Sequence, residues 1–515
     1  MVHIAALILA ALAAPQGKDA DLVGRWTFDG DVKDSGPAAL PTKAVGRLEF
    51  VDSPIGGSGK MAVFNGVDSQ IDITLTGDLG TREFTVAAWV FFLDLKPVRI
   101  LHHLPGWDLI LRPDGVLEWQ GREALRTGTQ AILGRQWTHL AMTHRKTEAG
   151  FEMAIWVNGE SAATLPQREP LPAPADSGLE IHPFTGMMDD LRFYRRALSR
   201  DELCRVVDEG LPWIRPKPHA KTPFPGKFEL LRDDVVVFAG GENARVGLDL
   251  GYLETVVSLR SAGKSARFRN MAWEGDTVYE QPRPLNFGSW SDQLRRVGAT
   301  VVFAQFGQLE ALEGQAGLER FTRSYEALLE QVARTTKRIV LVSPTPFGKG
   351  PPPQPDLSSR NGDLKLYVDA IRGLAAKNGY LFVDLTTRPL TGTDLTRDGL
   401  HLTTAGQWIA ARETVRQLEL AGVSDLDEPN SQGAFPREAY EKIRATIRTK
   451  NQLWNDSWRP GNWAFLNGDR TEQPSSRDHL DRRIRWFPVE VQQFPAMIRR
   501  EEEKIDSLIQ ASEKK

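Results

Sequence analysis

The sequence predicts a multidomain protein in which an all-β sandwich is followed by an α/β domain with a parallel sheet and by a helical tail. The chain has 515 residues, and a domain usually spans about 100–200 residues, so several cores are expected. Short strand-like runs separated by turn residues fill the first part, which is typical of a sandwich. In the second part apolar runs alternate with helical patterns, which favours a parallel sheet wrapped by helices.

Residues 1–14 are expected to form a cleaved signal peptide. An apolar run from Ile4 to Ala14 contains the small-x-small site Ala11–Leu12–Ala13, and the run is too short to span a bilayer. We therefore expect a secreted or periplasmic protein. The single cysteine, Cys204, excludes intramolecular disulfides and a thiolate metal cluster, so the cores alone must stabilise the fold.

The charge balance limits the partners. Lys and Arg number 64 and Asp and Glu 67, which gives a net charge of -3 and no global field that attracts nucleic acid or an anionic membrane. No later segment is apolar for long enough to span a bilayer. Nucleic-acid binding and a membrane span are therefore not expected.

Residues 20–210 are predicted to form the sandwich. The run "FTVAAWVFF" from Phe84 to Phe92 has no polar face, which indicates a strand buried on both sides. The run "MDDLRFY" is predicted to close the sandwich. A short helix should then start at Ser199, with Asp201 and Glu202 in its first turn.

The motifs of this half are "LVGRWTFDGDVKDSG", "FNGVDSQIDI", "FTVAAWV", "WTHLAMTH", "IWVNGE" and "FTGMMDDLRFYRRALSRDEL". Their order and spacing resemble laminin-G-like, concanavalin A-like jelly rolls. The resemblance implies binding of a polysaccharide or glycoconjugate, or of a protein ligand, through edge loops or the concave sheet.

Two further expectations follow from that resemblance. Among the tryptophans of this half, Trp107 and Trp119 are the best candidates for exposed rings that stack on sugars. Members of the family often hold calcium through acidic side chains. The candidate ligands for such an ion are Asp29, Asp34, Asp189 and Asp190. No other metal or cofactor is expected.

Residues 211–227 form a predicted linker, because five prolines fill "LPWIRPKPHAKTPFPG" and prevent regular hydrogen bonding. Residues 228–424 form the predicted α/β domain, in which "VVVF", "ARFRN", "ATVVFAQFG", "RIVLVSPTP" and "LFVDL" are the expected strands. Residues 425–515 form a helical, Trp-rich tail, which we expect to pack across a neighbouring domain.

Two stretches of the α/β half come where doubly wound folds gather reactive residues, just past the carboxyl ends of strands. The stretch "VVVFAGGEN" delivers Glu242 at the tip of the first strand. In "RDGLHLTTAGQWIAA", Asp398 and His401 are three residues apart, so the carboxylate can accept from one ring nitrogen and leave the other to act as a base.

This pair resembles the Asp-x-x-His block of the SGNH/GDSL hydrolase family. The resemblance implies a flavodoxin-like parallel sheet with a nucleophile after the first strand. It implies an oxyanion hole formed by the backbone N–H groups of residues 242 and 275 and by an Asn side chain. In this chain Glu242 occupies the nucleophile position, Gly275 supplies a backbone donor, and Leu309 replaces the Asn.

These departures set the functional prediction. No Ser or Thr lies between Asp233 and Leu253, so shifting the alignment does not restore a hydroxyl. Loss of one oxyanion-hole donor costs about 2.7–4 kcal/mol, and loss of the nucleophile removes the covalent route. We therefore expect an exported glycan-binding or glycan-processing protein that is weak or inactive as a serine esterase.

Two alternatives stay open. In the first, the domain is an active carbohydrate ester hydrolase in which Glu242, His401 and Asp398 act on a water molecule. In the second, the protein is a non-enzymatic scaffold or adhesion protein, and both domains serve as recognition surfaces. The residues Glu242 and Leu309 favour the second alternative over the first.

Overall fold

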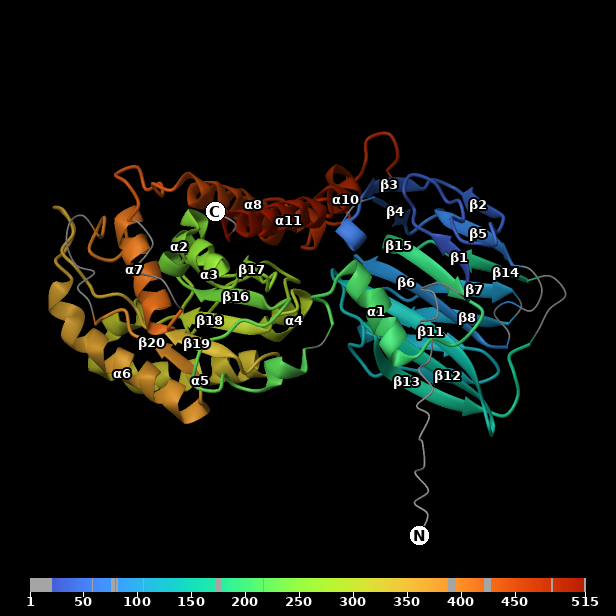
Figure 1. Ribbon diagram of the computed structural model, residues 1–515, viewed down its shortest axis with the longest axis horizontal. Helices are drawn as coiled ribbons and strands as arrows, with labels where there is room; N and C mark the ends of the chain where they lie inside the picture. The colour runs from blue at the N-terminus through green and yellow to red at the C-terminus, as the bar shows by residue number, and fades with distance from the viewer. Residues whose placement is uncertain are drawn as a thin grey trace, which may run out of the picture.

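The computed structural model describes residues 21–57, 59–75, 79, 82–104, 106–172, 177–215, 217–387, 395–420, 428–482 and 485–513. The expected signal peptide, residues 1–14, lies outside these residues. Figure 1 shows a β-sandwich beside an α/β domain, with long helices of the tail running along one edge of both. None of the helices in the described ranges has the length and apolar character needed to cross a membrane.

The sandwich consists of two antiparallel sheets packed face to face, and the predicted all-β fold of this half is confirmed. The first sheet has the order β13-β12-β11-β6-β15-β4-β3, and β1 pairs with β15. Its strands are β1 (Leu22–Trp26), β3 (Glu49–Asp52), β4 (Lys60–Asn65), β6 (Phe84–Phe92), β11 (Trp137–Thr147), β12 (Gly150–Val157), β13 (Glu160–Gln167) and β15 (Thr185–Tyr194).

The second sheet has the order β10-β9-β8-β7-β14-β5-β2. It presents one face to the core, because inward residues alternate with outward ones along strands such as β8 and β14. Its strands are β2 (Thr42–Val45), β5 (Gln70–Leu75), β7 (Val98–Leu104), β8 (Trp107–Arg112), β9 (Val116–Gln120), β10 (Ala124–Arg126) and β14 (Ser177–Ile181).

Strand β6 is buried along its whole length, as predicted. Its inner residues, such as Val86 and Val90, contribute to the main core of the sandwich. On the outer face, Trp89 and Phe91 pack against Leu211 and neighbouring apolar residues of the segment that follows the sandwich. The central part of the outer face of the first sheet is therefore covered by the segment after the sandwich and by the tail.

Helix α1 (Arg200–Gly210) covers another part of that outer face, where Leu203 packs with Ala87 of β6 and Ala141 of β11 (Figure 1). The predicted start of this helix is confirmed. Ser199 is its N-cap and forms a capping box with Glu202, which satisfies backbone donors of the first turn.

The expectation that Trp107 and Trp119 are exposed is wrong. Trp107 is 3% and Trp119 0% exposed, and both belong to the sandwich core. Trp107 stacks on Phe84 with ring centroids 5.6 Å apart. Both tryptophans occupy inward positions of the alternating strands β8 and β9, and period-2 alternation places such side chains against the opposite sheet.

The four acidic residues considered as calcium ligands each have other partners. Asp34 accepts hydrogen bonds from the backbone N–H groups of residues 25, 36 and 40, and Asp29 accepts one from the N–H of residue 60. Asp190 is paired with Arg192 at 2.6 Å, and Asp189 accepts a hydrogen bond from Ser53 at 2.5 Å. Within the described ranges, no group of three or more His, Cys, Asp or Glu side chains is arranged to hold a metal ion.

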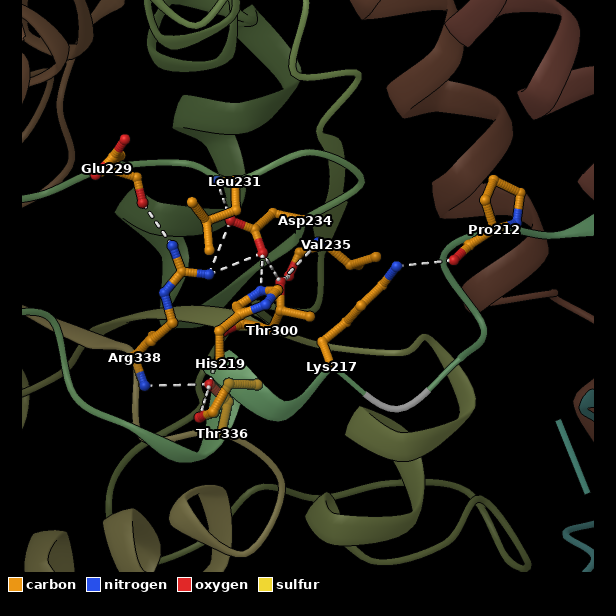
Figure 2. A network of polar contacts seen from close by, with 11 residues as sticks. Pro212, Lys217, His219, Glu229, Leu231, Asp234, Val235, Thr300, Thr336 and Arg338 are labelled. Carbon is orange, nitrogen blue, oxygen red and sulfur yellow. Dashed lines mark hydrogen bonds and ion pairs between the residues drawn. The ribbon is translucent and has the colours of Figure 1, made fainter. Parts of the chain in front are cut away.

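The proline-rich segment after α1 is docked on the α/β domain rather than extended throughout. Residues Pro218–Lys221 form the 3-10 helix η3. Figure 2 shows His219 of this turn at the buried carboxylate of Asp234, to which its Nε2 is 3.0 Å away. The same carboxylate pairs with Arg338 at 2.8 Å and accepts a hydrogen bond from Thr300 at 2.7 Å.

The α/β domain has a five-stranded parallel sheet with the order β17-β16-β18-β19-β20, and the predicted flavodoxin-like fold is confirmed. Its strands are β16 (Val235–Gly240), β17 (Arg267–Asn270), β18 (Val301–Gln305), β19 (Ile339–Val342) and β20 (Leu381–Val383). Its helices are α2 (Glu242–Leu250), α3 (Tyr252–Arg260), α4 (Trp290–Arg296), α5 (Leu318–Ala333), α6 (Asn361–Asn378) and α7 (Thr404–Gln417).

This strand order reverses at β16, since β17 lies on one side of it and β18 on the other. In open α/β sheets, ligands bind at such a switch point, beyond the carboxyl ends of the strands. The turn after β16 carries Gly240, Gly241 and Glu242, so the fold places these residues where a site is expected.

The tail packs on both domains, as predicted. Its helices are α8 (Glu438–Trp458), α9 (Trp463–Leu466), α10 (Trp486–Val491) and α11 (Phe494–Glu513), and α8 packs along α11. On the α/β side, Lys450 of α8 pairs with buried Glu254 at 2.7 Å. On the sandwich side, Arg499 of α11 donates to the carbonyls of Pro54 and Gly210 at 2.6 and 2.8 Å.

Candidate functional site

Asp398 and His401 form the predicted hydrogen-bonded pair on the loop before α7. Nδ1 of His401 lies 2.5 Å from Oδ2 of Asp398, and the backbone N–H groups of Leu400 and His401 donate to Oδ1 at 3.0 and 2.7 Å. Burial opposes ionisation of Asp398, but these hydrogen bonds outweigh it and hold its pKa below the ordinary value. With Nδ1 engaged, Nε2 is the nitrogen through which the ring can take a proton.

Glu242 is the first residue of α2 and follows the glycine turn at the tip of β16. Its carboxylate lies 3.4 Å from Nη2 of Arg397, and the two side chains are 26% and 60% exposed. Among the described residues, no hydrogen bond or salt bridge joins Glu242 to His401. The carboxylate of Glu242 therefore contacts Arg397 of the His401 loop rather than the imidazole.

The loop that carries Gly275 lies against the glycine turn. The N–H of Trp273 donates to the carbonyl of Gly240 at 3.1 Å, and a Cβ on Gly241 would stand 3.3 Å from the carbonyl oxygen of Asp276. Gly275 has a φ of 79°, a left-handed conformation that favours glycine, and a Cβ there would meet no atom within 4 Å. The structure thus brings the two predicted backbone donors, at 242 and 275, to one end of the sheet.

Leu309 lies just beyond the carboxyl end of β18 and is 41% exposed. It cannot donate a hydrogen bond to an oxyanion. The neighbouring Glu310 is buried and accepts from the N–H groups of Gly307 and Val278 at 3.0 and 2.8 Å, so it holds two loops together. Burial raises the pKa of Glu310 above its ordinary value.

Two residues that fix the His401 loop were not predicted from the sequence. Asn243 accepts from the N–H of Leu402 at 2.9 Å and donates to the carbonyl of Leu400 at 3.0 Å and to Gln308 at 2.9 Å. Gln308 in turn donates to the hydroxyl of Thr345 at 2.9 Å. Their only signal in the sequence is their position. Asn243 directly follows Glu242, and Gln308 directly precedes Leu309.

The dyad is partly exposed to solvent. The side chains of His401 and Asp398 are 28% and 21% exposed. A cavity of about 60 Å³ lies beneath α2 and is lined by Asn243 and Gln407, but by neither Glu242 nor His401. A substrate would therefore reach His401 from solvent, along the edge formed by α2 and the loop before α7.

Three solved structures illustrate the likeness to known folds. The first is domain 4 of an extracellular arabinanase from Geobacillus stearothermophilus in complex with arabinotriose, at 22% identity, a TM-score of 0.30, and coverage of 36% of this chain and 98% of that one. The second is the binding domain of Paraclostridial Mosquitocidal Protein 1, at 14% identity and a TM-score of 0.33, with coverage of 42% of this chain and 55% of that one. The third is the binding domain of Botulinum Neurotoxin DC in complex with SialylT, at 12% identity and a TM-score of 0.32, with coverage of 37% of this chain and 52% of that one. At these TM-scores the likeness supports no functional conclusion.

Two family models match the chain. Residues 65–204 match the model of the concanavalin A-like lectin/glucanases superfamily, and residues 231–409 match that of the GDSL-like lipase/acylhydrolase family. A search of curated proteins found no match. The matches agree with the sandwich, with the parallel sheet and with the position of the Asp398–His401 pair in the second domain. The chain is thus built from a concanavalin A-like domain followed by a GDSL-like lipase/acylhydrolase domain.

Proposed function

We propose that this is an exported glycan-binding protein whose GDSL-like domain does not hydrolyse esters by the serine route. The observation that carries the proposal is the turn after β16. A carboxylate, Glu242, replaces the hydroxyl there and pairs with Arg397 at 3.4 Å. Without a hydroxyl at this position, no acyl-enzyme can form, although Asp398 and His401 keep the geometry of a base and its orienting group.

The water-based alternative has less support. A carboxylate base must lie within hydrogen-bond reach of the water that it activates, and in a concerted role Glu242 and His401 would share that water. Glu242 is instead directed to Arg397 at 3.4 Å, so its carboxylate does not share a water with His401 in this arrangement. The arrangement favours recognition over hydrolysis.

The glycan-binding role rests on the sandwich, for which the matched family is named after lectins and glucanases. Because α1, Leu211 and the tail cover the centre of the outer face of the first sheet, the outer face of the second sheet is the broader surface left for a ligand. Sugars are bound by polar groups that hydrogen-bond to hydroxyls, and such groups are gathered on this face.

A row of polar side chains crosses the second sheet. The strand register sets His102 opposite Asp108 on one side and opposite Glu180 on the other. The row continues from Glu180 to Asp72 on β5 and from Asp108 to Gln120 on β9. Residues directly opposite in antiparallel strands share a face, so these five side chains form one continuous polar strip.

The test of the GDSL-like domain is ester hydrolysis by the wild type, Glu242→Ser, the double variant Glu242→Ser with Leu309→Asn, and the double variant with His401→Ala added. The wild type should hydrolyse activated esters poorly, and Glu242→Ser with Leu309→Asn should raise the rate measurably, because the base, its orienting carboxylate and a backbone donor are already in place. Glu242→Ser alone should recover less, since one missing oxyanion donor costs about 10²–10³ in rate.

The control for this set is His401→Ala in the double variant, which must abolish the gain. A wild type that is already fast and is inactivated by Glu242→Gln would contradict the proposal, because Glu242 would then be a working catalytic carboxylate.

The test of the sandwich is binding of the full chain to a panel of polysaccharides. Asp108→Asn and Glu180→Gln should each weaken binding severalfold, because each removes acceptors that sugar hydroxyls can use. Glu152→Gln, on the first sheet, is the matched control and should leave binding unchanged. Equal affinities for all four proteins would remove the polar strip from the proposal.

The export part of the proposal rests on the apolar run from Ile4 to Ala14. N-terminal sequencing of the native protein should begin near Ala14. A mature chain that still carries Met1 would refute it.

A further inference from the structure

A cavity of about 230 Å³ lies where the sandwich, the linker, the α/β domain and the tail meet. It is partly open to solvent and is lined by residues of all four parts, among them Trp137, Trp213, Arg296 and Trp458. A single water molecule needs about 30 Å³, so the space far exceeds a trapped water. It approaches the lower end of small-molecule sites, about 300 Å³.

The charges around this cavity do not balance. Four arginines line it against a single glutamate, Glu502. The carboxylate of Glu502 is already paired with Arg269 at 2.5 Å. Arg499 is paired with a glutamate one turn along its own helix at 3.0 Å. The positive charge that remains belongs to Arg135 and Arg296.

The hydrogen bonds of the Arg135 and Arg296 side chains within the described residues go to carbonyls. The nearest carboxylates, Asp94 and Asp292, act on them only through space, and Asp292 is already paired with Arg295 at 2.7 Å. Arg135 donates from Nη1 to the carbonyl of Asn286 at 2.5 Å, and Arg296 donates from Nη1 to that of Phe287 at 2.7 Å. Burial, together with repulsion from Arg296 and Arg485, lowers the pKa of Arg135 to about 10. The pKa of Arg296 is lowered by burial as well. Two cations are thus held close together at an energetic cost.

Four buried N–H donors around the cavity also have no acceptor within the described part of the chain. They are Nε of Arg135, Nε of Arg296, Nε1 of Trp137 and Nε1 of Trp458. A buried donor without a partner destabilises the site that holds it, so an occupant rich in acceptors would be stabilised here. The guanidinium of Arg135 also lies 5.4 Å from the ring centroid of Trp463, which adds a flat aromatic wall.

We propose that this cavity binds an anionic sugar unit, with its acid group between Arg135 and Arg296 and its ring against the tryptophans. The acid group supplies the charge and the acceptors that the arginines lack, and the ring supplies an apolar face of the size that an indole covers. The site goes beyond the function proposed above, because it lies apart from the polar strip of the second sheet and from the Asp398–His401 pair.

The experiment is calorimetric titration of the full chain, followed in parallel by tryptophan fluorescence. The probes are glucuronate, galacturonate, glucose 6-sulfate, glucose and inorganic sulfate. The wild type should bind the acidic sugars at least about tenfold more tightly than glucose or inorganic sulfate, because only they combine charge with a ring. The sulfated and carboxylated probes distinguish which acid group the site prefers.

Two variants assign the binding to this cavity. Arg135→Gln and Arg296→Gln should each weaken binding of the preferred acidic sugar about tenfold or more. Arg295→Gln is the matched control, because Arg295 is paired with Asp292 at 2.7 Å and does not line the cavity. Its affinity should equal that of the wild type.

Several outcomes would overturn the proposal. They are equal binding of glucose and glucuronate, equal binding of inorganic sulfate and the acidic sugars, or no binding of any probe. These comparisons use the wild type alone, so the proposal can fail even if an arginine variant does not fold. Loss of sheet binding in Asp108→Asn would leave this site intact, which separates the two proposals.

Discussion

At the scale of single residues, the candidate site divides into what the sequence could place and what it could not. The spacing of Asp398 and His401 predicted their hydrogen bond, because three residues on a tight loop bring a carboxylate within reach of an imidazole. The ion pair between Glu242 and Arg397 was not predicted, because 155 residues separate the partners. Only the packing of α2 beside the His401 loop sets that distance.

Asn243 supports this loop with two hydrogen bonds and makes a third to Gln308, so its replacement is expected to be costly. Asn243→Ala should lower the free energy of unfolding by about 1–3 kcal/mol, because the N–H of Leu402 and the carbonyl of Leu400 lose their partner. Denaturant unfolding measures this change. The same substitution should remove most of the ester hydrolysis gained by Glu242→Ser with Leu309→Asn, since His401 would no longer be held.

A matched control is Asn455→Ala on the tail helix α8, where the side chain makes only a 3.5 Å contact with Asp456. Its effect should stay within about 0.5 kcal/mol. If Asn243→Ala is as mild as this control, the loop is fixed by its backbone and not by the asparagine.

At the scale of elements, local patterns predicted most of the fold. Strand β6 was recognised because all nine of its residues are apolar or small, and α1 because Ser199 can cap a helix whose first turn carries Asp201 and Glu202. The exposure of Trp107 and Trp119 was predicted wrongly. Their neighbouring turn residues suggested loops, whereas the register of β8 and β9 turns both indoles toward the core.

The linker also has a feature that its local composition did not predict. Its prolines predicted a segment without regular hydrogen bonds, and they do exclude a strand or a long helix. His219, in the short turn of this segment, contacts the buried carboxylate of Asp234 at the start of the α/β domain. That contact depends on a partner 15 residues further along the chain and has no signature in the local composition.

At the scale of the whole molecule, buried charges hold the tail to the α/β domain. Arg267 and Arg269 of β17 face Glu502 of α11 at 3.4 and 2.5 Å, and the glutamate is only 3% exposed. Burial alone would raise the pKa of Glu502, but the two arginines outweigh it and lower that pKa below its ordinary value. The ion pairs join the last helix of the chain to an edge strand of the sheet.

Glu502→Gln should therefore lower the free energy of unfolding of the α/β domain and tail by about 3–5 kcal/mol, because it leaves the buried Arg269 without a counter-charge, whereas Arg267 keeps Asp506 at 3.1 Å. A carboxylate whose pKa is depressed on folding contributes stability that is present above its unfolded pKa and lost as the pH falls. The difference between wild type and variant should accordingly shrink below about pH 4.3, the ordinary pKa of a glutamate. Denaturant titrations at several pH values measure both effects.

The adjacent Glu503 provides the control, because its side chain is 49% exposed and its partner Arg499 keeps two carbonyl acceptors when the carboxylate is removed. Glu503→Gln should change stability by no more than about 1 kcal/mol at neutral pH. Similar losses for the two variants would mean that the helix, and not the buried charge, fastens the tail.

The position of α11 also sets an order of assembly during synthesis. A chain folds domain by domain from its N-terminus, so the sandwich and the sheet can form before α11 is available. Until Arg499 and Glu502 emerge, Arg269 lacks its carboxylate and the carbonyls of Pro54 and Gly210 lack their donor. A chain that stops a few dozen residues early would leave a charged sheet edge and an open junction exposed to proteases. The synthesis of α11 is thereby a condition for the two domains to become one body.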